Sequence, residues 1–151
     1  MTTPGGPRGE MPPASDARWA YEIMIEVPFR DLDALGHVNH TVFLRYMEDA
    51  RTRYYMELAG LTDPTRLDFI LAEVTCTYHA PAGFRDRLRC GVRPESVGTR
   101  SFVWAYRVWN EATGATVATG RSVLVSFDYA AGRTVPVPDV IRRECERWLG
   151  G

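Results

Sequence analysis

The sequence predicts an α+β domain in which one antiparallel sheet curls around a single long helix. Apolar residues recur at spacings of three and four after position 39, which indicates a helix of about five turns. Four later segments alternate with a period of two, which is typical of strands, and turn sequences separate them. Strands joined by short turns run antiparallel, so we expect these four to form a hairpin series. The one long helix is then the cover for one face of the sheet.

The first strand and the long helix stand on either side of a polar loop. The strand is expected at Tyr21–Val27 and the loop at Phe29–Val38. The helix follows a cap at Asn39 or Thr41 and ends at Gly60, where a C-terminal stop belongs. The apolar face of this helix consists of Phe43, Met47, Ala50, Tyr54 and Leu58, widened by Tyr46.

The later strands are marked by alternation and by the turns between them. They are expected at Phe69–His79, Arg87–Val97, Ser101–Asn110 and Thr116–Asp128. In the first of these, one face is predicted to carry Ile70, Ala72, Val74, Cys76 and Tyr78. Pro81 and Gly83 mark the turn that follows it. A short helix through Trp148 is expected after Pro138.

Length and composition predict one globular domain behind a mobile tail. The chain has 151 residues, of which 45% are hydrophobic and 25% charged. Residues 1–18 are rich in proline and glycine, so we expect a disordered tail there and one domain over residues 19–151. The net charge of −1 argues against a nucleic-acid partner. All 18 positive charges are arginine, a residue that suits phosphate contacts.

The cysteine pattern and the N-terminal residues predict a cytoplasmic protein. The three cysteines are widely spaced and form no C-x-x-C pair, which indicates reduced thiols and no structural metal site. The first residues have no apolar core of a signal peptide, and no apolar run has the length of a membrane span. We therefore expect no membrane partner.

Several widespread enzyme motifs are absent from the sequence. It contains no G-x-S-x-G elbow, no G-x-x-x-x-G-K-[ST] phosphate loop and no H-E-x-x-H zinc motif. No G-x-G-x-x-G dinucleotide motif follows a strand. Chemistry is therefore expected from carboxylates, histidines, hydroxyls and backbone donors.

Such groups are densest between Arg30 and His40, directly before the helix. A helix N-terminus presents unpaired N–H groups, which can stabilise the oxyanion formed when a thioester or ester is attacked. An aspartate just upstream can act as a nucleophile or activate water, and Asp31 and Asp33 are both candidates. The alternative is structural: both aspartates form Asx-turns and Asn39 only caps the helix.

A motif in this region resembles a known family. The run FRDLDALGHVN from Phe29 to Asn39, followed by FLRYMEDAR from Phe43 to Arg51, resembles the 4-hydroxybenzoyl-CoA thioesterase-like family. This family includes acyl-CoA thioesterases of the YbgC and FadM type. The family pattern is F-x-D-x-D-x-x-G-H-V-N, then a helix carrying E-x-A-R, and the element order fits from Tyr21 onward.

The resemblance implies a hot-dog fold, in which about five antiparallel strands wrap around one long central helix. It implies homodimers or homotetramers with active sites at the dimer interface. The catalytic aspartate of the family corresponds to Asp33, and the backbone oxyanion donors to Gly36, His37 and Val38. Leu35 stands where benzoyl-type members carry a Pro-Ala-Gly turn, which favours the broader acyl-CoA group.

Further residues are candidates for the site, each with a structural alternative. Asn39 is expected to cap the helix and organise the loop. His37 is expected either to donate a hydrogen bond to the thioester carbonyl or to cap the helix. Substrate-binding candidates are Tyr46, Glu48, Arg85, Arg87 and Arg100. The alternatives are core packing for Tyr46, pairing of Glu48 with Arg45 or Arg51, and solvated turn charges for the arginines.

The function expected is therefore hydrolysis of an acyl-CoA thioester to the free acid and CoA. No cofactor is implied, since coenzyme A is part of the substrate. The sequence leaves two alternatives open: a thioesterase that acts on acyl carrier protein, and a module that binds acyl-CoA without turnover. It also leaves open whether Asp33 is the nucleophile or the general base.

Overall fold

A computed structural model describes residues 18–151, so nearly all of the predicted tail at 1–18 lies outside the described residues. The strands are β1 (Tyr21–Glu26), β2 (Phe69–Tyr78), β3 (Arg87–Val97), β4 (Ser101–Asn110), β5 (Thr116–Asp128) and the two-residue β6 (Arg133–Thr134). The helices are α1 (His40–Ala59) and α2 (Asp139–Leu149), with short 3-10 turns at Phe29–Asp31 and Pro64–Arg66.

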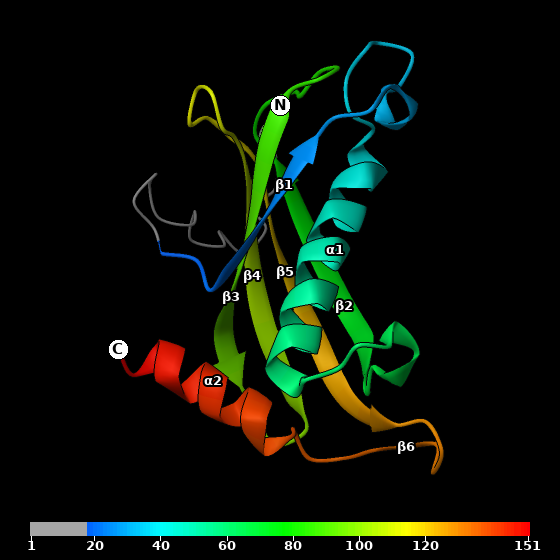
Figure 1. Ribbon diagram of the computed structural model, residues 1–151, viewed down its shortest axis with the longest axis vertical. Coiled ribbons are helices and arrows are strands. Elements are labelled where there is room, and N and C mark those ends of the chain that lie inside the picture. The colour runs from blue at the N-terminus through cyan, green and yellow to red at the C-terminus, as the bar shows by residue number, and fades with distance from the viewer. Residues whose placement is uncertain (1–17) are drawn as a thin grey trace, which may run out of the picture.

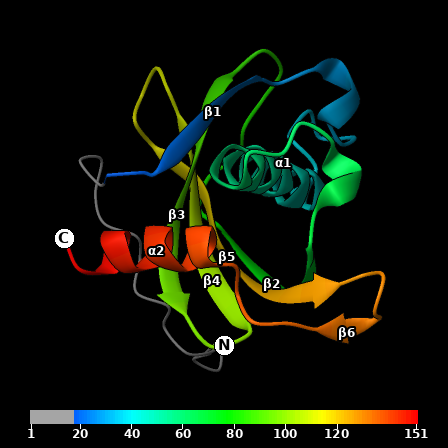
Figure 2. The ribbon, with the colours of Figure 1, turned by 60° about the horizontal axis from the view of Figure 1, so that its bottom comes forward.

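The sheet is antiparallel, with strand order β1-β3-β4-β5-β2, and β6 pairs with β5. It curls around α1, which lies along its concave face, as Figure 1 and the turned view in Figure 2 show. This is the hot-dog arrangement that the sequence motif implied, and the α+β prediction is confirmed. The predicted spans of β3, β4 and β5 match the structure to the residue.

The predicted hairpin between β2 and β3 is wrong. β2 pairs with β5, whereas β3 pairs with β1 at the other side of the sheet. Residues 79–86 make the crossing between them. Their backbone is satisfied elsewhere, because Ala82 O accepts from Val38 N at 2.8 Å and Arg85 N donates to Val27 O at 3.0 Å. Pro81 and Gly83 therefore lie in a crossing connection between two distant strands, and not in a tight hairpin turn.

The predicted face of β2 also needs correction. The register against β5 shifts between Leu71 and Glu73, which inserts one extra residue into β2. Before the bulge, Phe69 and Leu71 lie on the side that faces α1. After it, Val74 and its period-two successors take that side, so Ile70 and Ala72 do not share it.

The helix is fixed to the sheet by a close approach at Gly120 in β5. A Cβ built on Gly120 would lie 2.7 Å from both Met47 Sδ and Thr75 O, closer than real atoms approach. Met47 is fully buried on the sheet side of α1. Aromatic rings fill the space beyond it, and the largest fully buried side chains include Trp104, Tyr55, Tyr106 and Phe102.

Both predicted ends of α1 are confirmed. Asn39 is the N-cap, since its Oδ1 accepts from Thr41 N at 3.0 Å and from Thr41 Oγ1 at 2.7 Å. Gly60 ends the helix in the left-handed conformation, with φ of 66°. The N-terminus of α1 is thereby placed directly after the 29–38 loop.

Candidate functional site

The 29–38 loop folds into a tight turn at the N-terminal end of α1, uppermost in Figure 1. Asp33 N donates to His37 O at 2.7 Å, and Gly36 N donates to Asp33 O at 3.1 Å. Gly36 has φ of 77°, a conformation that residues with a side chain rarely adopt. A bridge between His37 and Gly83 joins this turn to the 79–86 segment.

The Asp33 carboxylate is exposed at this turn. Its Oδ1 accepts from Leu35 N at 2.9 Å and from His37 N at 3.2 Å, which is the Asx-turn that the structural alternative predicted. Within residues 18–151, its Oδ2 accepts no hydrogen bond. One oxygen therefore fixes the direction of the carboxylate, while the other is available to a substrate or a water molecule.

The three predicted oxyanion donors already have acceptors within the chain. Gly36 N and His37 N donate to Asp33, and Val38 N donates to Ala82 O. By contrast, the backbone N–H of His40, the first residue of α1, donates to no acceptor in the described part of the chain. The first N–H groups of a helix have no partner within the helix, so this donor points to where a ligand could bind.

His40 is not among the residues that the sequence analysis named for the site. The sequence left the cap open between Asn39 and Thr41; with Asn39 as the cap in the structure, position 40 begins the helix and its N–H has no helical acceptor. The His40 carbonyl is fixed separately, because it accepts from Tyr78 OH at 2.8 Å.

Asp31 lies on the inner side of the loop and is only 4% exposed. It accepts from Arg45 Nη2 at 2.5 Å and from Tyr46 OH at 2.7 Å, both on α1. Burial and the hydrogen bond to Asp31 raise the pKa of the Tyr46 hydroxyl above its usual value, so it remains a donor at neutral pH. Asp31, Arg45 and Tyr46 are called the Asp31 cluster below.

Two predicted substrate contacts on α1 have different surroundings. Tyr46 is buried, with its hydroxyl directed to Asp31, whereas Glu48 is exposed and lies 3.6 Å from Arg51. Both border a hollow of about 690 Å³ between β1 and the outer face of α1. Arg51 itself is 4% exposed, and its Nε has no hydrogen-bond partner among the described residues.

The three predicted arginines do not lie together. Arg85 and Arg87 lie at the loop end of β3, where they pair weakly with Glu26 and Glu111, both at 3.4 Å. Arg100 lies in the turn at the opposite end of β3 and donates to Thr134 O at 2.6 Å. An eleven-residue strand spans roughly 36 Å, so Arg100 cannot contact the same ligand as Arg85 within one chain.

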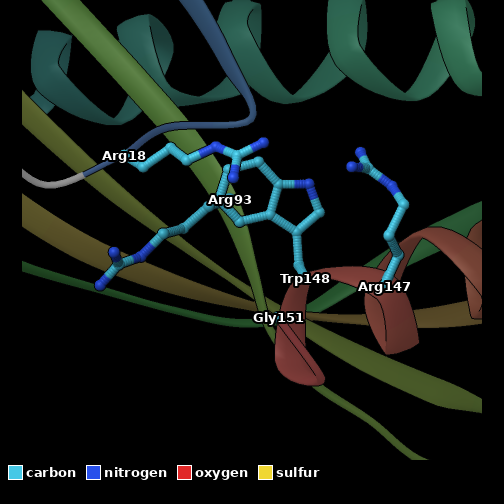
Figure 3. Close-up of a pocket in the computed structure, with 5 residues that line it drawn as sticks. All are labelled: Arg18, Arg93, Arg147, Trp148 and Gly151. Carbon is cyan, nitrogen blue, oxygen red and sulfur yellow. The ribbon is translucent and has the colours of Figure 1, made fainter.

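A second hollow, of about 240 Å³, is lined by Arg18, Arg93, Arg147, Trp148 and Gly151. Figure 3 shows that the Arg93 side chain points away from the other two arginines. Arg18 stacks on the Trp148 ring at 5.0 Å, and Arg147 is paired with Glu144 at 2.7 Å. The three guanidinium groups do not converge on one point, so this hollow offers no anion site comparable to the loop.

Residues 18–151 contain neither a metal-ligand cluster nor a membrane-spanning helix. No group of three or more His, Cys, Asp or Glu side chains there could hold a metal ion. None of the helices in that range is long and apolar enough to cross a membrane.

Most of the chain is similar to known thioesterases. Residues 27–145 match the family model described as the Thioesterase-like superfamily. A thioesterase from Thermus thermophilus, solved with coenzyme A and Zn, is 35% identical with a TM-score of 0.76, over 85% of this chain and 98% of that chain. A thioesterase-superfamily structure from Jannaschia sp. CCS1 is 28% identical with a TM-score of 0.79, and the match covers 89% of this chain and 86% of that chain.

A curated relative adds a named activity. The 1,4-dihydroxy-2-naphthoyl-CoA hydrolase of Thermosynechococcus vestitus is 28% identical over 117 residues, which are 75% of this chain and 80% of that protein. The thioester named for that relative is an ester of coenzyme A, the molecule bound in the Thermus structure.

Proposed function

The chain belongs to the Thioesterase-like superfamily, of the 4-hydroxybenzoyl-CoA thioesterase type, and from this we propose that it hydrolyses an acyl-CoA thioester. Hydrolysis yields the free acid and CoA. The proposal rests above all on the exposed Asp33 carboxylate and on the N–H of His40 at the start of α1, which has no acceptor in residues 18–151. Related proteins that bind coenzyme A or cleave a CoA ester support it.

The reaction needs a nucleophile for the carbonyl carbon and donors for the carbonyl oxygen. In one route, the Asp33 carboxylate attacks the carbonyl, the C–S bond breaks, and CoA leaves as the thiolate. Water then hydrolyses the mixed anhydride and regenerates the carboxylate. In the other route, Asp33 accepts a proton from the water that attacks the carbonyl directly.

The oxyanion that forms in either route needs a positive partial charge close by. We propose that the His40 N–H supplies it, together with the positive end of α1. The N–H groups of Gly36, His37 and Val38 then act by holding the turn, since each already has an acceptor. This changes the set of donors that the family motif implied, but leaves Asp33 in its role.

Coenzyme A carries phosphates, and the loop end of β3 offers exposed guanidinium groups for them. Arg85 and Arg87 are 72% and 60% exposed and pair with carboxylates only at 3.4 Å. Weak surface pairs of this kind are readily exchanged for a phosphate. Arg100 lies at the opposite end of β3, too far away to bind the same coenzyme A molecule within one chain.

The test is the release of CoA thiol from a panel of acyl-CoA esters of different chain length and aromatic content. We expect saturable turnover of at least one ester. If acyl groups on acyl carrier protein are hydrolysed faster than the same groups on CoA, the natural substrate is the acyl carrier protein thioester. Tight binding of acyl-CoA without turnover would contradict the enzyme and favour a binding module.

The two routes differ in where oxygen from water appears. In a single turnover in water labelled with oxygen-18, label enters the Asp33 carboxylate when Asp33 is the nucleophile and water attacks its carboxyl carbon in the mixed anhydride. Label found only in the released acid is expected for the general base, and also for a mixed anhydride that water attacks at the acyl carbon. Mass spectrometry of the peptide that contains Asp33 provides the measurement.

A further inference from the structure

We propose that Asp31 is the positioning residue of the active site: it contacts no substrate but fixes Asp33 relative to the start of α1. This inference rests on the proposed function and names a residue that acts through Asp33. It assigns to the two aspartates of the motif two separate tasks, positioning for the first and chemistry for the second.

Asp31 is attached to its surroundings at four points. Its carboxylate accepts from Arg45 Nη2 at 2.5 Å and from Tyr46 OH at 2.7 Å. Its backbone N donates to Pro28 O at 3.1 Å, and its backbone O accepts from Asn39 N at 2.9 Å. One residue thus connects the end of β1, the helix cap and the second turn of α1.

The Asn39–Asp31 hydrogen bond closes the loop that contains Asp33. Inside this ring, Asp33 is fixed by bonds to Leu35 and His37. Any shift of Asp31 against α1 therefore moves the Asp33 carboxylate relative to the His40 N–H. Catalysis is sensitive to such a shift, because misplacement by about 1 Å can reduce a rate about 100-fold.

The Asp31 carboxylate is buried, so removing either of its partners would be costly. A carboxylate that is 4% exposed needs both a charge partner and hydrogen bonds, and Arg45 and Tyr46 provide them. The Tyr46 hydroxyl is occupied by Asp31, whereas Arg45 keeps a 59% exposed side chain at the edge of the hollow between β1 and α1. The cluster is therefore suited to holding the loop and unsuited to direct chemistry.

The test compares Asp31→Asn with a matched control, Asp68→Asn. Asp68 also accepts a tyrosine hydroxyl from α1, that of Tyr55, but it precedes β2 at the opposite end of the helix. We expect Asp31→Asn to lower kcat at least 10-fold with KM changed less than about 3-fold. Asp68→Asn is expected to leave kcat within about 2-fold of the parent, whatever its effect on the melting temperature.

A double variant separates positioning from general loss of structure. If Asp31 acts only through Asp33, then Asp31→Asn adds nothing further in an Asp33→Asn background, and the residual rates of the single and double variants are equal. Multiplied losses in the double variant would overturn the proposal. So would an increase in KM at unchanged kcat, or equal losses of kcat in the Asp31 and Asp68 variants.

A measurement independent of activity keeps this inference separate from the proposed function. We expect amide hydrogen exchange at residues 33–38 to be faster in Asp31→Asn than in the parent and in Asp68→Asn. Unchanged exchange would contradict positioning even if the enzyme is active, whereas a parent without thioesterase activity would defeat only the proposed function. If Asp31→Asn does not fold, Tyr46→Phe and Arg45→Gln each remove one contact and are measured in the same way.

Discussion

At the scale of single residues, the oxyanion donor that we propose is the backbone N–H of His40, which no side-chain pattern marks. Side-chain patterns drew attention to Asp33, His37 and Asn39, whose cap role is confirmed by the bond to Thr41. Backbone donors leave no direct trace in a sequence, because every residue except proline has one. Only the exact start of α1 shows which N–H is left free, and helix boundaries are uncertain from sequence alone.

Substitution of His40 by proline removes this N–H while sparing the helix. Proline is tolerated at the first helical position, and Asn39 has ψ of 138°, which suits a residue before proline. We expect His40→Pro to lower kcat about 100- to 1000-fold, the usual cost of losing one oxyanion donor. His40→Ala keeps the N–H and is expected to stay within about 3-fold. Equal kcat values for the two variants, measured on one acyl-CoA, would refute the role of the backbone.

At the scale of elements, local signals predicted where strands and helices lie but did not predict which strands pair. The spans of β3, β4 and β5 follow from alternation and turn residues, which act over a few positions. The pairing of β2 with β5 joins segments about fifty residues apart, beyond the reach of such local signals. The bulge after Leu71 likewise has no marker in the sequence, because neither glycine nor proline stands there.

The contact between α1 and β5 predicts a specific loss of stability. In Gly120→Ala, the added Cβ would meet Met47 Sδ and the Thr75 carbonyl, both at 2.7 Å, so the Met47 side chain and the backbone of the neighbouring strand β2 must shift. We expect the free energy of unfolding to fall by about 1–3 kcal/mol, as for other overpacked cores. Urea denaturation provides the measurement.

The control for this prediction is Gly98→Ala, whose added Cβ meets nothing nearer than 3.4 Å. Its unfolding midpoint is expected to stay close to that of the parent. If both alanine variants lose the same stability, the effect comes from glycine itself and not from the approach of α1 to β5.

At the scale of the whole molecule, β2 forms one side of the sheet and has a strand edge that no strand within residues 18–151 pairs with. Apolar residues on it are partly exposed: Ile70, Leu71 and Tyr78 at 36%, 44% and 46%. An edge of this kind is a site for pairing with a second copy. We therefore predict a homodimer through β2, which would bring a second chain close to the N-terminal end of α1.

This prediction is tested by light scattering of the parent and of two charge variants. Ile70→Lys, on the face of β2 away from α1, is expected to shift the protein to a monomer and to lower its activity. Met24→Lys also changes an exposed apolar residue, on the other edge strand β1, and is expected to leave the dimer intact. A parent that is monomeric and fully active at micromolar concentration would contradict the predicted assembly.

The central claim, that Asp33 carries out thioester hydrolysis, is tested most directly by the rate of CoA release in Asp33→Asn. The matched control is Asp128→Asn, since Asp128 makes the same kind of turn, accepting from Ala130 N and Ala131 N at 2.9 and 3.0 Å, outside the 29–38 loop. We expect a loss of at least about 100-fold in kcat for Asp33→Asn and none for Asp128→Asn. A folded Asp33→Asn variant that hydrolyses acyl-CoA as fast as the parent would contradict the account.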